Sequence, residues 1–126
     1  MIKDLKIYEA KTYSEDISIK EMAKEMIKNS ANRLFFITKE GVLIGVVTHF
    51  DIVKAVSEDV DLSMPIKTIM NKPEAVKESD EEEFAYLIMK KYNIDTCPVI
   101  DEKGVFKGYV RFMEVYKAIF EKFRGE

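Results

Sequence analysis

The chain has 126 residues, of which 47% are hydrophobic and 34% charged, with only 5 glycines and 3 prolines. This length suits a single domain, and the composition excludes disordered, collagen-like and low-complexity proteins. Twenty basic residues stand against 23 acidic ones, which gives a net charge of −3, and the two signs are interspersed. We therefore expect no nucleic-acid partner, because such proteins gather basic residues on one face.

Hydropathy and cysteine content bear on the compartment in which the chain works. No apolar run approaches the roughly 18 residues that span a bilayer, and the charged N-terminus lacks the apolar centre of a signal peptide. A single cysteine excludes an internal disulfide and suits a reducing environment. We expect a cytoplasmic protein without a membrane partner.

The sequence repeats itself at a spacing of 63 residues. Residues 22–59 align with 85–122 without a gap, and ten of these 38 positions are identical, whereas chance would give about two. The leading residues match at an offset of 64 instead, with 2–5 facing 66–69. The pattern predicts one unit used twice, with repeats at 1–60 and 66–126 and a linker at 61–65.

The first repeat reads as β-α-β-β-α. Its expected elements, in chain order, are an extended lead at 7–13, a helix from a Ser18–Glu21 capping box, strands at 34–37 and 42–47, and a helix from near Thr48 to near Ser57. Gly41 lies in the turn between the two strands, where a tight hairpin needs a positive φ.

The second repeat has the same order. Its expected elements are an extended lead at 74–77, a helix from a Ser79–Glu82 capping box, strands at 97–100 and 105–110, and a helix from near Arg111 to near Phe123. About 60 residues are too few for a secure independent core. We therefore expect an α/β (α+β) fold in which the two tandem repeats pack sheet against sheet about a pseudo-twofold axis.

Thr48 and Asp51 form the most informative polar pair. A helix N-terminus attracts phosphate through its unpaired N–H groups and its dipole, and a hydroxyl at Thr48 adds a polar contact. The carboxylate of Asp51, one turn later, can accept hydrogen bonds from both hydroxyls of a ribose. The same T-x-x-D spacing also suits a helix capping box. The residues alone leave both interpretations open.

Two copies of this unit closely resemble a pair of CBS domains. Residues 97–104 match the family's apolar-P-V-V/I-D-x-x-G stretch, residues 45–52 match its G-x-x-[ST]-x-x-D-apolar signature, and residues 66–70 match its lead-in. The resemblance covers essentially the whole chain. It implies a regulatory module that binds AMP, ADP, ATP or S-adenosylmethionine in the cleft between the repeats, with no obligatory cofactor.

The resemblance also assigns residues to a first cleft, built on Thr48 and Asp51. The further residues that it implies are Val47, His49, Ala75, Val76, Ala85, Asp95, Thr96 and Cys97. Backbone groups near 75–76 and 95–96 would contact the adenine edge, with Ala85 lining the base pocket. Each assignment has a simpler alternative, because the apolar side chains suit the core of any such fold and His49 suits a solvent-facing first turn.

The second cleft departs from the family pattern. Its counterparts of the hydroxyl and the acid are Arg111 and Glu114, and its partners would be Thr12, Asn32 and Arg33. Arg111 suits either a bidentate phosphate contact or an ion pair with a carboxylate, such as Glu114 itself. We favour a dead or altered site, and hence one ligand per chain.

Other chemistry is sparse in the sequence. With one histidine and one cysteine, no His/Cys metal cluster or Cys–His couple can be assembled, and neither a P-loop nor a Rossmann fingerprint occurs, so we expect no metal and no enzyme activity. One helix carries an aromatic and aliphatic stripe that suits a homodimer contact: Phe112, Tyr116, Ile119, Phe120 and Phe123. The alternative function is a ligand-free scaffold that acts through protein contacts. Under either reading a regulated protein partner is expected.

Overall fold

The computed structural model describes residues 1–125, which form two compact units. The first-repeat unit consists of Lys11–Pro73, and the second-repeat unit consists of Met1–Ala10 together with the chain from Glu74 onward. Glu126, the last residue of the predicted second repeat, lies outside the described residues. Each unit is considered by itself below.

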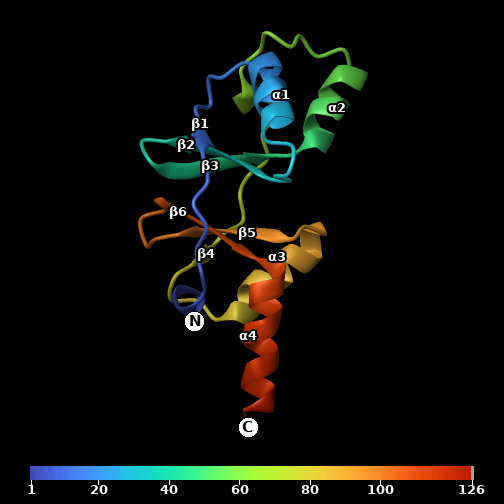
Figure 1. The fold of residues 1–126 in the computed structure, drawn as a ribbon. Coiled ribbons are helices and arrows are strands. Elements are labelled where there is room, and N and C mark those ends of the chain that lie inside the picture. The colour runs from blue at the N-terminus through green and yellow to red at the C-terminus, as the bar shows by residue number, and fades with distance from the viewer. Residues whose placement is uncertain (126) are drawn as a thin grey trace. The chain divides into compact units, whose positions relative to one another are not determined.

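The first-repeat unit is a small sheet covered by two helices. The strands follow the order β1-β2-β3, with β1 parallel to β2 and β2 antiparallel to β3. Figure 1 shows both helices on one face of this sheet. The elements are β1 (Thr12–Tyr13), α1 (Ile19–Lys28), β2 (Phe35–Lys39), β3 (Val42–Val47) and α2 (His49–Ser57).

The second-repeat unit has the same architecture. Its sheet follows the order β4-β5-β6, again with one parallel and one antiparallel pairing, and both helices lie against it (Figure 1). The elements are β4 (Val76–Lys77), α3 (Glu82–Tyr92), β5 (Thr96–Ile100), β6 (Phe106–Arg111) and α4 (Phe112–Arg124). The predicted β-α-β-β-α order is thus confirmed in each repeat. In the described part of the chain, no helix combines the length and apolarity that crossing a bilayer requires.

The two predicted capping boxes have different outcomes. Ser18 caps α1, because its hydroxyl accepts the backbone N–H of Glu21 at 3.0 Å. The prediction for Ser79 is wrong, since α3 begins only after this residue. The reason is the side chain of Asp80, which accepts the backbone N–H of Lys77 at 2.8 Å and closes a turn before the helix can start.

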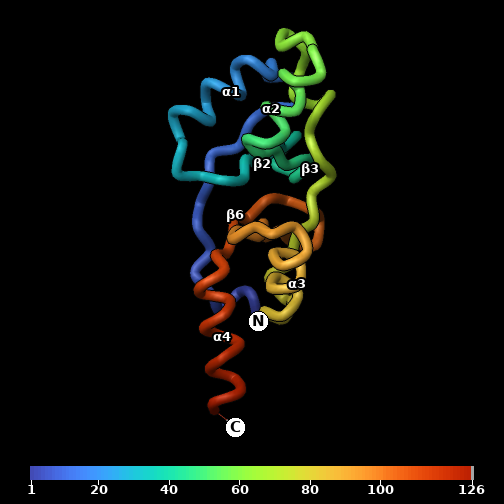
Figure 2. Tube along the Cα trace, turned by 90° about the vertical axis from the view of Figure 1, so that its right-hand side faces the viewer, coloured from blue at the N-terminus to red at the C-terminus, as the bar shows by residue number. Residues whose placement is uncertain are grey.

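The leading segments of the two repeats complete each other's units. Short 3-10 turns form at Ile2–Asp4 and Ile66–Thr68. Ile2 is fully buried in the core of the second-repeat unit, where its N–H donates to the carbonyl of Asp80 at 2.8 Å. Figure 2 shows this N-terminal segment beside α3. Ile66 is fully buried in the first-repeat unit, and its N–H donates to the carbonyl of Ile17 at 2.7 Å.

The compact units therefore divide the chain differently from the sequence repeats. The hydrophobic core of each unit includes a fully buried isoleucine from the lead of the other repeat. In the second-repeat unit this leading segment lies more than 60 positions before the rest of the unit. In the first-repeat unit the leading segment follows directly after the other residues of the unit. Contacts between distant segments of this kind are not visible in local periodicity.

Candidate functional site

The Thr48–Asp51 pair stands at the start of α2, with Thr48 as the N-cap residue. The Oδ2 atom of Asp51 accepts the backbone N–H of Thr48 at 2.8 Å and the Thr48 hydroxyl at 3.0 Å. Both residues are half-buried. The capping interpretation is therefore realised, with the carboxylate as the acceptor that satisfies the helix start.

Asn71 is a third member of this cluster, and no sequence motif points to it. Its side-chain amide donates to Asp51 Oδ2 at 2.8 Å. Its backbone forms an isolated bridge with Val46 at the end of β3, through N···O distances of 2.9 and 3.0 Å. For the described residues, the hydrogen bonds to the Asp51 carboxylate all end on Oδ2. Oδ1 is thus the oxygen that can accept a ligand hydroxyl without breaking the cap.

The Thr48–Asp51 cap is compatible with ligand binding, because the cap leaves Oδ1 of Asp51 available. A carboxylate has about four lone-pair sites on two oxygens, and the cluster with Thr48 and Asn71 engages one oxygen only. The Thr48 hydroxyl has a single proton, which it donates in its hydrogen bond to Asp51 Oδ2. A phosphate at this helix start would have to redirect that proton, so backbone N–H groups and the helix dipole would supply most of its attraction.

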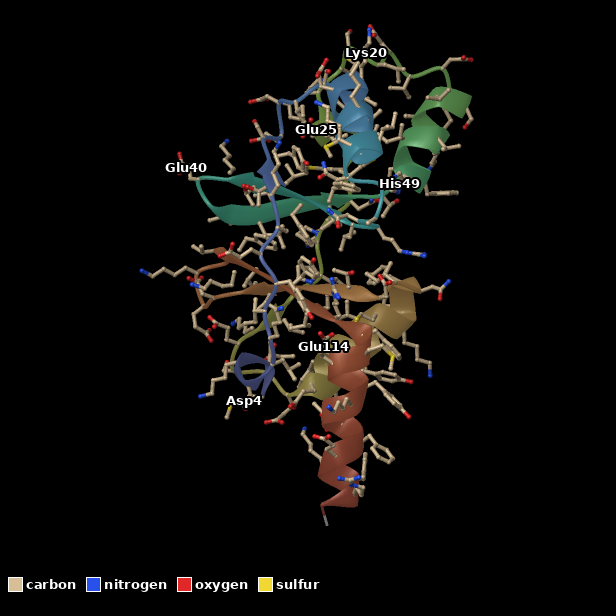
Figure 3. All side chains as sticks on the ribbon, viewed as in Figure 1. Asp4, Lys20, Glu25, Glu40, His49 and Glu114 are labelled. Carbon is tan, nitrogen blue, oxygen red and sulfur yellow. The ribbon has the colours of Figure 1, made fainter. Side chains whose placement is uncertain are left out.

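The second copy has a different cluster at the equivalent place. The hydroxyl of Tyr8 donates to Oε1 of Glu114, which Figure 3 shows in the first turn of α4. The guanidinium of Arg111 lies over the Tyr8 ring, 4.1 Å from its centroid, and the ring stacks on Tyr109 at a centroid distance of 5.5 Å. The side chains that would receive a ligand are thus engaged within the unit.

The sequence left Arg111 open to a phosphate contact or to an ion pair with a carboxylate such as Glu114. In the structure the hydrogen bond to Glu114 comes from Tyr8. This hydrogen bond, together with burial, raises the pKa of the Tyr8 hydroxyl. The pKa of Arg111 is raised chiefly by its hydrogen bond with Tyr109, with the charge of Glu114 a smaller cause. Tyr8 therefore contacts both charged residues in different ways: its hydroxyl donates to Glu114, and its ring lies under the guanidinium of Arg111.

The residues assigned to the adenine contact all lie in the second-repeat unit. Val76, Ala85 and Cys97 are buried in its hydrophobic core, which agrees with the simpler alternative for their side chains. Ala75 precedes β4, Asp95 precedes β5, and Thr96 is the first residue of β5, with its hydroxyl 3.2 Å from Asp95 Oδ1. Only backbone groups of the three core residues remain as candidates for contact with a ligand.

The remaining predicted residues lie in the first-repeat unit. Val47 is buried in the core at the end of β3. His49 is exposed at the first position of α2, where Figure 3 labels it, and its ring packs edge-to-face with the ring of Phe35 at a centroid distance of 5.7 Å. Thr12 lies in β1, and Asn32 and Arg33 lie in the loop before β2, all three exposed. Their part in a second site stays a prediction.

Two further groups could in principle react or bind a metal ion, but each has a structural explanation. Burial raises the pKa of the Cys97 thiol to about 12, so this cysteine remains protonated and unreactive at neutral pH. Glu81, Glu82 and Glu83 gather at the start of α3, but the ammonium of Lys122 lies 2.8 to 3.1 Å from a carboxylate oxygen of each. Lys122 thus supplies the positive charge that a metal ion would otherwise provide.

Comparison with known proteins identifies the family. The model of the CBS domain matches this chain twice, at residues 2–58 and 66–121. The chain belongs to the CBS domain family. Among solved structures, a CBS domain protein from Pyrobaculum aerophilum complexed with AMP is 25% identical, with a TM-score of 0.80 over 99% of this chain and 98% of that one. The CBS domain pair of protein MJ0100, in complex with 5′-methylthioadenosine and S-adenosyl-L-methionine, is 29% identical, with a TM-score of 0.74 over 96% of each chain.

Curated relatives include enzymes of which CBS domains form a small part. The chain is 33% identical to the L-aspartate semialdehyde sulfurtransferase of Methanocaldococcus jannaschii over 81% of its own length. It is 35% identical to a homoserine O-acetyltransferase of Methanosarcina acetivorans over 89% of its length. In each case the match spans 20% of the enzyme. An uncharacterised 17.7 kDa protein of Acidianus ambivalens is 30% identical over 95% of this chain and 71% of its own.

Proposed function

We propose that this CBS domain pair is a regulatory module that binds an adenosine-containing ligand, of the class of AMP, ADP, ATP or S-adenosylmethionine, through Thr48 and Asp51. The observation that carries the proposal is the carboxylate of Asp51, which is held by three hydrogen bonds on Oδ2 and so presents Oδ1. The similar proteins of known structure that contain AMP or S-adenosyl-L-methionine support this ligand class.

The chemistry divides between the two residues. Oδ1 of Asp51 would accept hydrogen bonds from ribose hydroxyls, which are charge-assisted and each contribute roughly 1.5–3 kcal/mol. The start of α2 at Thr48 would attract a 5′-phosphate through the helix dipole and its backbone N–H groups, whereas a positively charged sulfonium substituent would gain nothing from either. Ligand occupancy would then shift the conformation of the module and pass the signal to a regulated protein partner.

Several finer assignments belong to the same proposal. Backbone groups at 75–76 and 95–96 would contact the adenine, and the altered cluster at Arg111 and Glu114 would leave one ligand per chain. The engagement of Tyr8 by both residues supports that asymmetry. The enzyme activities of longer relatives are not proposed for this chain, and its cytoplasmic location stays a prediction.

Thermal melting with a panel of ligands tests the proposed function. We expect AMP, ADP, ATP or S-adenosylmethionine, at 100 times its Kd, to add about 2.7 kcal/mol to the free energy of unfolding. For a chain of this size that corresponds to a rise in Tm of roughly 10 °C. Guanosine monophosphate and inorganic phosphate are the controls. A panel in which no adenosine compound moves the Tm would favour the ligand-free scaffold.

A homodimer is the second part of the proposal, because the helices of the second-repeat unit carry exposed apolar side chains. The predicted stripe divides in two: Phe112 and Ile119 pack against the core, and the others are exposed together with residues of α3. The exposed set consists of Phe84, Leu87, Tyr92, Met113, Tyr116, Phe120 and Phe123. Rings at Phe112, Tyr116 and Phe120 stack along α4 at centroid distances of 6.2 and 6.4 Å.

Light scattering tests the dimer at micromolar concentration. A two-fold contact uses the same surface on both subunits, so one charged substitution acts twice. We expect the unaltered protein to be a dimer and Phe120→Glu to be a monomer with an unchanged circular dichroism spectrum. Lys117→Glu on the same helix, outside the exposed apolar set, is the matched control and should remain dimeric. A monomeric unaltered protein, with and without nucleotide, contradicts the assignment.

A further inference from the structure

We propose that Asn71 is a positioning residue for ligand recognition, which holds the carboxylate of Asp51 so that Oδ1 faces the ribose hydroxyls. This inference rests on the proposed function and deepens it, because it assigns the discrimination between ribose and deoxyribose to a residue outside the T-x-x-D motif. The carrying contact is the hydrogen bond from Asn71 Nδ2 to Asp51 Oδ2, at 2.8 Å.

The position of Asn71 is set by its backbone, independently of this contact. Its N–H donates to the carbonyl of Val46 at 2.9 Å, and its carbonyl accepts the N–H of Val46 at 3.0 Å. Val46 stands two residues before Thr48, so the bridge fixes Asn71 beside the start of α2. The amide thus reaches Asp51 from an anchored backbone, although the side chain itself is exposed.

Asn71 adds to the restraint that the cap places on the Asp51 carboxylate. The two donors of Thr48 hold Oδ2 from the helix end, and rotation about the Cβ–Cγ bond of Asp51 would move both oxygens together. A third donor to Oδ2, from a different segment of chain, further restricts that rotation and with it the direction of Oδ1. Directional presentation of an acceptor is what a ligand with two neighbouring hydroxyls requires.

The second copy repeats this arrangement with different chemistry. Tyr8 stands 63 positions before Asn71, and Glu114 stands 63 positions after Asp51. Tyr8 forms the same kind of backbone bridge, with Tyr109, and its hydroxyl donates to Glu114. A donor from the incoming segment therefore engages the acid in both units. In the second copy this donor is also covered by the guanidinium of Arg111.

The test compares AMP with 2′-deoxy-AMP by calorimetric titration, in the unaltered protein and in Asn71→Leu. Leucine matches the shape of asparagine and lacks the amide donor. We expect the affinity for AMP to fall roughly tenfold in Asn71→Leu, while that for 2′-deoxy-AMP changes little, so that the preference for ribose is lost. Asn71→Ala is the second variant, for the case that leucine perturbs the fold, and we expect it to show the same loss of preference for ribose. Tyr8→Phe, which removes the equivalent donor of the second copy, should keep the full preference.

The outcomes separate the two levels of the proposal. If Asn71 serves only to anchor its segment on Val46, both ligands weaken by the same factor in Asn71→Leu and Asn71→Ala, and the positioning role is overturned. An unchanged affinity for AMP in both variants also overturns it. If the unaltered protein binds neither ligand, while S-adenosylmethionine and ATP also fail to bind, the proposed function itself is wrong.

Discussion

Replacing Asp51 by alanine is expected to weaken the binding of AMP roughly tenfold to hundredfold. The substitution removes the acceptor for the ribose hydroxyls, and a charge-assisted hydrogen bond contributes roughly 1.5–3 kcal/mol, where each 1.4 kcal/mol is a factor of ten in affinity. It also removes the acceptor of three hydrogen bonds within the unit. Loss of the cap should therefore lower the free energy of unfolding by about 0.5–2 kcal/mol.

Binding and stability can be separated by a second substitution at the same position. In Asp51→Asn an amide oxygen can still accept the N–H of Thr48 and so keep the cap, but the negative charge that strengthens the ribose contact is lost. We expect this variant to melt close to the unaltered protein and yet to bind AMP more weakly. Glu114→Ala, the counterpart in the second copy, should bind AMP with unchanged affinity. An Asp51→Ala protein with full affinity contradicts the assignment of the ribose contact.

Replacing Gly108 by alanine is expected to cost about 3 kcal/mol or more of stability. Gly108 has a φ of +129°, a conformation that residues with a side chain rarely adopt, and this strain alone costs about 1–3 kcal/mol. An added Cβ would also overlap the backbone carbonyl of Tyr8. The overlap would push away the segment that bridges to Tyr109 through N···O distances of 2.8 and 3.0 Å, and each lost bond adds about 0.5–1.5 kcal/mol.

Gly45→Ala is the matched control, because Gly45 is the equivalent glycine of the first repeat. Its φ is not positive, and the added Cβ would meet the flexible side chain of Met70 instead of backbone. We expect a cost of about 1–2 kcal/mol, measured by urea unfolding, and less than that of Gly108→Ala. Combining Gly45→Ala with Met70→Ala should cost less than the sum of the two single substitutions, since the second makes room for the first. A larger loss of stability in Gly45→Ala than in Gly108→Ala would contradict the role assigned to the close approach between Gly108 and the backbone of Tyr8.

Local signals in the sequence predicted much of the fold. The 63-residue repeat predicted one β-α-β-β-α unit used twice, and the strand-sized apolar run at 42–47 located β3 at the bounds that the structure shows. The capping signal at Ser18 succeeded because its partner, Glu21, lies within the same turn. The same signal failed at Ser79, where a competing side chain, Asp80, closes an earlier turn. Local patterns identify candidates for a cap without deciding between neighbouring ones.

The candidate site depends on contacts that such patterns do not show. Asn71 and Asp51 are 20 positions apart, and Tyr8 and Glu114 are 106 apart. Neither donor belongs to a helix or strand, so no periodicity points to it. A weak signal did exist: the repeat offset of 63 aligns Tyr8 with Asn71 and thus pairs two polar donors. The lead-in residues 2–5 and 66–69 align at an offset of 64 instead, and this offset does not pair Tyr8 with Asn71.

The exchange of leading segments has the same cause. Ile2 and Ile66 are fully buried, but nothing in the sequence around either residue indicates which core it enters. The core that receives each one is assembled from the other repeat. Only the tertiary structure shows this.

Calorimetric titration of the unaltered protein with AMP and with S-adenosylmethionine tests the central claim most directly. The account predicts that the ligand that binds does so with one strong site per chain, which is lost or greatly weakened in Asp51→Ala and retained in Glu114→Ala. Two equal sites per chain, or a single site that survives Asp51→Ala and disappears in Glu114→Ala, would contradict it.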